Sequence, residues 1–194
     1  YGVEHGERAQ RFAQAVAYFR AVMEKGPLQV SSALGDFSGA ELLPKPVAGK
    51  IPLIVTGASG QSLAWVAEQA DGWLTYPQST HNALGPKRLA EKISAWRSLI
   101  PDDGFRPHMT NEWIDLVEDP NYPRTSLRGG FVLRTGRKGL IALLEEWQAA
   151  GVNHAALGVQ FADRPAADIL QEMAEEVLPL FPSHEGGLPS NVAW

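Results

Sequence analysis

A short turn rich in glycine and hydroxyl side chains is the feature of the sequence that most plainly points to chemistry. Residues 54–76 read IVTGASGQSLAWVAEQADGWLTY, and the turn is the stretch GASGQS at 57–62. Glycine tolerates positive φ, serine favours helix N-caps, and the first N–H groups of a helix have no internal partner. Such a turn can receive a phosphate, with hydrogen bonds from the hydroxyls of Thr56, Ser59 and Ser62. Alternatively, Ser59 only caps the following helix and the glycines ease a tight connection, since the turn matches neither the Walker nor the G-x-G-x-x-G pattern.

A cluster of basic residues is the second candidate. The segment RGGFVLRTGRKG at 128–139 contains Arg134 and Arg137, which could attract an anionic substrate or a phosphate. Alternatively, the segment is a solvated basic loop whose last arginine begins a helix. The five histidines stand at no metal-ligand spacing and the chain has no cysteine, so we expect no metal site and no thiolate chemistry.

The hydrophobic pattern predicts alternating helices and strands that would position these residues. Apolar spacing predicts a first helix over 7–23, and a region rich in proline and glycine, 25–49, reads as a long loop. Short apolar runs predict strands at 51–56, 73–76, within 108–119 and at 152–161, each followed by a helix. Parallel strands need such crossovers, so the pattern indicates an α/β fold with a parallel sheet. It fits an open sheet or part of an eight-stranded barrel, and the length of 194 residues alone favours the open sheet.

Polar residues alternate along the third of these strands. Asn111 and Trp113 alternate with Glu112 and Asp115, so one pair is expected to point into a barrel, as a packed network or as part of a substrate pocket.

The composition excludes several classes of function. A hydrophobic share of 44% without a long apolar run predicts no membrane span, and no export signal is visible, so we expect a cytoplasmic protein. A net charge of −5 with scattered bases argues against nucleic-acid binding.

Beyond these patterns, the sequence resembles a known family. The segment ELLPKPVAGKIPLIVTGASGQSLAWVAEQADGWLTYP at 41–77 is similar to the luciferase-like flavin-dependent monooxygenase superfamily, particularly its bacterial luciferase-type branch. The similarity continues through WIDLVEDP, LRTGRKGLIALLEEWQAAGVNHAALGVQF and RPAADILQEMAEEVLPLF. It implies a (β/α)8 TIM barrel of which this chain supplies the C-terminal half, about strands five to eight. Residues 1–181 would form this barrel part, and 182–194 an irregular tail.

The resemblance also implies a cofactor and its contacts. The turn would hold the phosphate of reduced FMN, through the residues Thr56, Gly57, Ser59, Gly60, Gln61 and Ser62. The end of the sixth strand would contact the flavin ring through Thr75 and Tyr76, although Tyr76 could instead be a packing residue. No catalytic residue is identified, because the cofactor carries the chemistry.

The implied activity is an FMN-dependent monooxygenase or oxidoreductase acting on a small organic substrate with O2. The alternatives are an F420-dependent dehydrogenase of the same superfamily and a non-catalytic flavin-binding barrel fragment. A separate flavin reductase is a possible partner. A half barrel exposes unpaired edges, so we also expect a homodimer or association with an N-terminal half.

Overall fold

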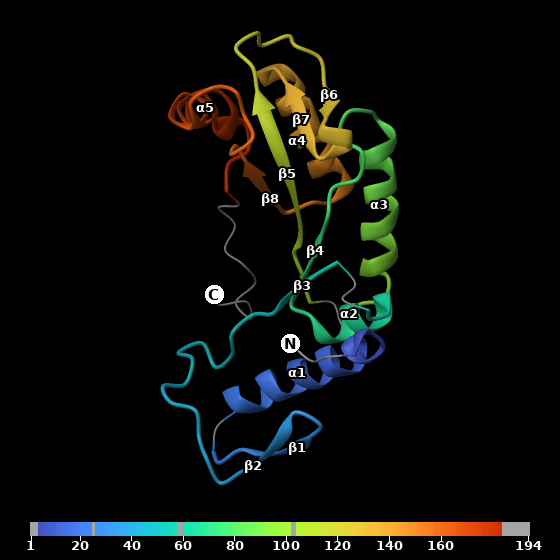
Figure 1. The fold of residues 1–194 in the computed structure, drawn as a ribbon, viewed down its shortest axis with the longest axis vertical. Coiled ribbons are helices and arrows are strands. Elements are labelled where there is room, and N and C mark those ends of the chain that lie inside the picture. The colour runs from blue at the N-terminus through green and yellow to red at the C-terminus, as the bar shows by residue number, and fades with distance from the viewer. Residues whose placement is uncertain (1–3, 25, 58–59, 102–103, 184–194) are drawn as a thin grey trace.

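Four parallel strands form the centre of the fold in a computed structural model that describes residues 4–24, 26–57, 60–101 and 104–183. These strands are β3 (Ile54–Thr56), β4 (Gly72–Thr75), β5 (His108–Leu116) and β8 (His154–Gly158), and they pair in that order. Each coincides with one of the four predicted strands, and the predicted parallel sheet is confirmed (Figure 1). The strand expected over 51–56 is shorter than predicted and begins at Ile54.

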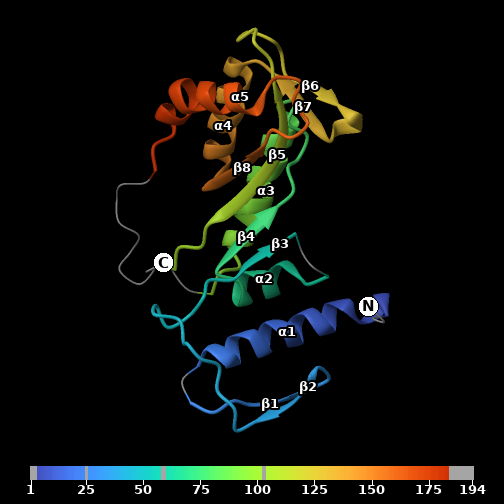
Figure 2. The same ribbon diagram turned by 60° about the vertical axis from the view of Figure 1, so that its left-hand side comes forward.

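One helix precedes the strands, and a helix follows each of the four central strands along the chain, as predicted. They are α1 (Arg8–Met23), α2 (Leu63–Gln69), α3 (Leu84–Arg97), α4 (Arg137–Ala150) and α5 (Ala166–Glu172), the last continuing into a π-helical turn at Met173–Val177. The first helix was expected from residue 7 and begins at Arg8. Helix α4 ends where Gly151 adopts φ 95°, a left-handed conformation that glycine adopts at low cost. Figure 2 shows α4 and α5 near the upper end of the sheet and α1 beyond its lower end.

The core lies between the helices and one face of the sheet. Val55 and Trp73 pack with α2 and with Trp96 of α3, while Ile114 and Leu116 pack with α4 and α5. Because successive strand residues point to opposite faces, the neighbours of these residues project to the other side of the sheet. We call that second side the open face; it carries the side chains of Thr56, Leu74, Tyr76, Met109, Asn111, Trp113 and Asp115.

Two segments that the sequence analysis left irregular contain strands. The predicted loop 25–49 includes an antiparallel hairpin of β1 (Gln29–Ser32) and β2 (Gly35–Ser38), so that prediction is wrong over these residues. A second hairpin, β6 (Thr125–Leu127) and β7 (Val132–Thr135), precedes α4, and β7 pairs in parallel with the upper end of β5. Of the predicted tail 182–194, residues 184–194 lie outside the described part.

Candidate functional site

The turn between β3 and α2 is anchored on both sides by protein contacts. Gly57 adopts φ 61°, and its N–H donates to the carbonyl of Leu74 at 2.6 Å. Gly60 adopts φ 77°, and a Cβ at this position would lie 3.0 Å from the Cβ of Ala9 on α1. The side chain of Gln61 donates to the carbonyl of the same Ala9 at 2.5 Å. The turn is therefore held between the sheet and α1.

The helix after the turn is capped by Ser62. Its Oγ accepts a hydrogen bond from the N–H of Trp65 at 3.1 Å. Ser59, the cap considered in the sequence analysis, lies outside the described residues, and the cap is the residue next to the helix instead. Among the described residues, no protein acceptor is present for the backbone N–H groups of Gly60, Ser62, Leu63 and Ala64. These four amides could donate to an anion.

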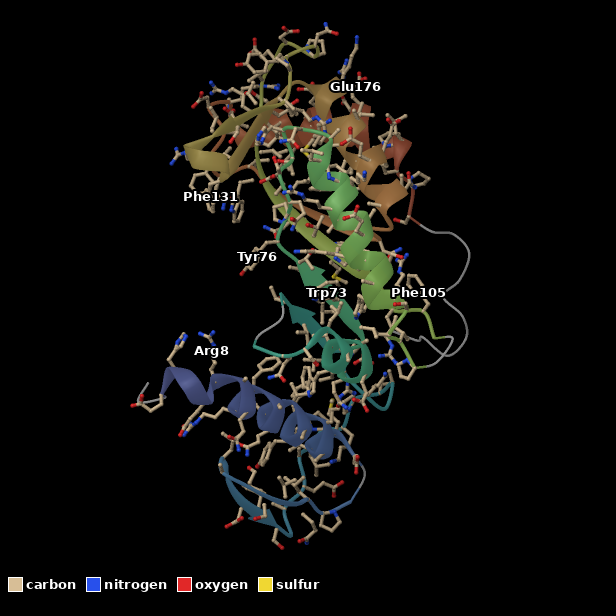
Figure 3. The ribbon with its side chains drawn as sticks, turned by 90° about the vertical axis from the view of Figure 1, so that its right-hand side faces the viewer. Arg8, Trp73, Tyr76, Phe105, Phe131 and Glu176 are labelled. Carbon is tan, nitrogen blue, oxygen red and sulfur yellow. The ribbon has the colours of Figure 1, made fainter. Side chains whose placement is uncertain are left out.

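The two residues predicted to contact a flavin ring point to opposite sides of the sheet. Thr75 is buried, its Oγ1 lies 3.1 Å from Nε2 of His108, and its carbonyl accepts from the hydroxyl of Thr110 at 3.0 Å. Its side chain therefore belongs to the helix side of the sheet. Tyr76 is 67% exposed and lies on the open face, away from α3 (Figure 3). The alternative raised from the sequence, a Tyr76 whose ring packs while its hydroxyl stays in water, does not fit so large an exposed fraction, and its contact with a flavin stays a prediction.

Glu112 of β5 is a buried polar residue on the helix side of the sheet, opposite the open face. Glu112 is 3% exposed and accepts hydrogen bonds from the hydroxyl of Thr80 at 2.6 Å and from the N–H of Trp113 at 2.8 Å. Burial raises the pKa of Glu112, and these hydrogen bonds oppose the rise. Because Glu112 lies on the same side of β5 as the core residue Ile114, it contributes to packing and is not directed at the open face.

Three polar or aromatic residues of β5 do face the open side. They are Asn111, Trp113 and Asp115. The pairing of Asp115 with Glu112 in the sequence analysis is therefore wrong, because residues 111, 113 and 115 share one face of the strand and Glu112 lies on the other. The side-chain oxygen of Asn111 is buried and has no hydrogen-bond partner among the described residues. Continuing the register of Thr75 with Thr110 places Tyr76 beside Asn111. Strand alternation was the signal for this set, but the sequence alone did not give the side.

The two arginines predicted to meet an anion are paired with carboxylates. Arg134, on β7, contacts Asp115 at 2.5 Å and also contacts Asp163, and these neighbours raise the pKa of its guanidinium. Arg137 begins α4 and contacts Glu172 at 3.8 Å and Glu176 at 3.4 Å. Arg137 begins a helix, as the alternative expected of the last arginine, whereas Arg134 lies on a strand, so the loop is wrong for Arg134. Their charges are already compensated within the protein.

The match to a family model decides the identity of this fold. The model described as luciferase-like monooxygenase matches residues 1–100. The chain belongs to the luciferase-like monooxygenase family. The resemblance seen in the sequence is therefore confirmed, and the sheet with its helices is part of the family's TIM barrel.

Solved structures share the fold at low sequence identity. A monooxygenase, RslO1 from Streptomyces bottropensis, has a TM-score of 0.71 and 15% identity, with 93% of this chain and 64% of that chain covered. An F420-dependent secondary alcohol dehydrogenase in complex with an F420-acetone adduct has a TM-score of 0.62 and 16% identity, with 84% and 59% covered.

A coenzyme F420-dependent tetrahydromethanopterin reductase from Methanopyrus kandleri has a TM-score of 0.66 and 14% identity, with 90% and 63% covered. The chain thus spans less than two thirds of each of these three structures. No curated protein matches it.

In the described residues, no group of three or more histidine, aspartate or glutamate side chains is placed to hold a metal ion. No helix in the described part has the length and apolar character needed to cross a membrane.

Proposed function

We propose that this luciferase-like chain forms the cofactor-binding wall of a flavin-dependent oxidoreductase that uses reduced FMN and O2 on a small organic substrate. The observation that carries the proposal is the arrangement on one face of the sheet. Three features follow one another across the ends of β3 and β4 and along β5: residues 57 and 60–62 of the turn, the exposed ring of Tyr76, and the oxygen of Asn111, which has no hydrogen-bond partner in the described part of the chain. Parallel barrels place their sites at these C-terminal strand ends.

The residues present fit the chemical groups of a flavin nucleotide. The amides of Gly60, Ser62, Leu63 and Ala64 and the hydroxyl of Ser62 suit a phosphate, with Thr56, Gly57 and Gln61 shaping the described part of the turn. Ser59, also predicted to hold the phosphate, lies outside that part. The buried oxygen of Asn111 suits an N–H donor of the reduced ring, and Tyr76 offers a ring face. Thr75 would act from beneath, by fixing the end of β4 through His108 and Thr110.

The division of labour follows from this fit. The redox chemistry would come from a bound reduced flavin together with O2, which explains the lack of an evident catalytic triad or acid–base pair among these residues. The chain itself would bind the phosphate, orient the ring against Tyr76 and Asn111, and keep water away from the ring. This proposal is compatible with three kinds of partner: a flavin reductase, a second copy of the chain, or the remainder of a barrel. It is also compatible with a cytoplasmic location.

An F420-dependent dehydrogenase is the second candidate, because two of the similar structures are described as F420-dependent. FMN is supported over F420 because the longer anionic tail of F420 calls for more basic contacts, and the two arginines predicted to meet an anion, Arg134 and Arg137, are paired with carboxylates. Of the arginines at 128–139, this leaves Arg128 without a carboxylate partner among the described residues. A non-catalytic flavin-binding fragment is the third possibility.

Flavin titration tests the proposal. FMN and riboflavin are titrated separately against the wild-type chain, Ser62→Ala and the exposed control Ser94→Ala on α3, with flavin fluorescence as readout. We expect Ser62→Ala to weaken the binding of FMN by about 1.5–3 kcal/mol, the range for a hydrogen bond to a charged group. The affinity for riboflavin, which has no phosphate, should stay unchanged. Ser94→Ala should change neither.

Each outcome of the titration has a consequence. Equal affinities for FMN and riboflavin in a folded wild-type sample would refute the proposed phosphate site. Tighter binding of F420 than of FMN would favour the dehydrogenase. Flavin binding without O2 consumption on adding a reductase would leave the non-catalytic possibility.

A further inference from the structure

Three aromatic side chains from separate parts of the chain meet on the open face. Trp113 of β5, Phe131 before β7 and Phe161 after β8 have ring centroids 5.5–6.0 Å apart in tilted or edge arrangements. We call these three residues the aromatic cluster. Phe131 is 51% exposed, and Trp113 and Phe161 are only partly buried. The aromatic cluster therefore presents ring surface to the open face.

The position of Trp113 in the aromatic cluster is fixed by the neighbouring strand. Trp113 is paired with Gly158 of β8, and a Cβ on Gly158 would lie 2.0 Å from the indole ring. The indole thus lies directly against the backbone of β8, where a larger residue cannot fit. A ring held this way is a pre-formed surface for binding.

The positively charged side chain of Arg128 lies next to the aromatic cluster. Cζ of Arg128 lies 5.0 Å from the centroid of the Phe161 ring. Arg128 is exposed, and no carboxylate of the described residues lies within ion-pairing distance of it. The nearby arginines differ, because each has a carboxylate partner: Arg124, Arg134, Arg137 and Arg164.

The backbone that presents Arg128 adopts an uncommon conformation. Arg128 has φ 52°, and it is followed by Gly129 at φ 69° and Gly130 at φ 97°. A left-handed conformation costs a non-glycine residue about 1 kcal/mol, so the turn holds the arginine side chain over Phe161 at a cost in stability. The N–H of Phe131 closes the turn on the carbonyl of Leu127 at 3.1 Å.

From these observations we infer that the aromatic cluster and Arg128 bind the substrate, and that the substrate is an aromatic acid: a planar ring carrying a carboxylate. The rings supply a stacking surface, and Arg128 supplies a positive charge that no described carboxylate compensates. This inference rests on the proposed flavin site. It assigns the aromatic cluster to the substrate because Trp113 lies beyond Asn111 along β5, away from the β4-paired residues His108–Thr110 and so from the turn proposed for the phosphate.

The experiment compares two probes of similar shape and different charge. The dissociation constants of 2-naphthoate and the neutral 2-naphthalenemethanol are measured by calorimetry with the wild-type full chain, Arg128→Gln, Phe131→Ala and the control Arg88→Gln, an exposed arginine on α3. We expect Arg128→Gln to raise the dissociation constant of 2-naphthoate roughly tenfold or more and to leave that of the alcohol unchanged. Phe131→Ala should weaken the binding of both probes, and Arg88→Gln should change neither affinity.

Several results would overturn the inference. These are failure of 2-naphthoate to bind the folded wild-type chain, equal losses for both probes in Arg128→Gln, and equal losses in Arg128→Gln and Arg88→Gln. Titration of the same variants with FMN shows whether Arg128 binds a substrate carboxylate or the flavin phosphate. A loss of FMN affinity in Arg128→Gln, with riboflavin affinity unaffected, would mean that Arg128 binds the flavin phosphate instead.

The two proposals also fail separately. If the chain binds flavin but not naphthoate, only the proposed aromatic-acid site is refuted. If the chain binds naphthoate through Arg128 but binds no flavin, the proposed function is refuted and the proposed anion site is retained.

Discussion

The buried imidazole of His108 predicts a specific dependence of folding stability on pH. His108 is fully buried, with its ring 5.5 Å from that of Trp73 and 6.4 Å from that of Trp96. Its Nε2 contacts Thr75, and its Nδ1 has no partner among the described residues. Burial, with a smaller contribution from the positive charge of Arg97, lowers the pKa of His108 from 6.5 to about 4.

The sign and size of the effect follow from this pKa. Between pH 6.5 and pH 4 the unfolded chain binds a proton at His108 that the folded chain does not, so stability falls as the pH is lowered through this window. The difference between the two pKa values corresponds to about 3 kcal/mol in full, of which about 2 kcal/mol is lost between pH 7 and pH 5.

Urea unfolding of the wild type and His108→Gln, followed by circular dichroism at pH 7, 6 and 5, measures this contribution. Glutamine keeps a hydrogen-bonding group near Thr75 and cannot titrate, so the wild type should lose about 2 kcal/mol more than the variant over this range. Other groups, including Glu112, titrate in both proteins and cancel in the comparison. Parallel pH profiles, or an NMR titration of His108 with a pKa near 6.5, would refute the reasoning.

Three further substitutions test the packing, each by urea unfolding at pH 7. Gly158→Ala should destabilise the chain by about 1–3 kcal/mol, because the new Cβ overlaps the ring of Trp113; an unchanged midpoint would contradict the contact. Arg134→Met should cost about 3 kcal/mol by leaving the buried carboxylate of Asp115 without its main partner, and adding Asp115→Asn should recover part of that loss. Leu140→Ala, at a fully buried position of α4, should cost about 3 kcal/mol, and a loss below 1 kcal/mol would contradict its place in the core.

Helices and central strands were predictable because their hydrophobic spacing repeats over many residues. The end of α4 at Gly151 was visible in the same way, since glycine tolerates the φ of 95° found there. The hairpin of β1 and β2 was missed because β2 is exposed throughout and so has no apolar pattern. Strands β6 and β7 were missed because each is short and their places depend on pairing with each other and with β5.

Within the candidate site, the sequence predicted the glycine and serine turn but not its surroundings. Periodicity shows that Asn111 and Glu112 point in opposite directions, whereas only the position of the helices decides which of them is buried beneath α3 and α4. The pairing of Arg134 with Asp115 and Asp163 joins residues far apart in the sequence, so a basic cluster looked available to an anion when it was not.

The two parts of the proposed site are held in different ways, and this has a consequence for specificity. The turn is fixed by main-chain contacts of Gly57 to the sheet and by the packing of Gly60 on Ala9, so a change there would move α1 or β4. Arg128 instead sits on a hairpin whose strand β6 has three residues and whose turn is bonded mainly to itself. Substitutions at 128–131 can therefore change the charge and shape offered to a substrate while the sheet and the turn stay in place. The chemistry of the cofactor and the choice of substrate are, on this argument, separable properties of one barrel wall.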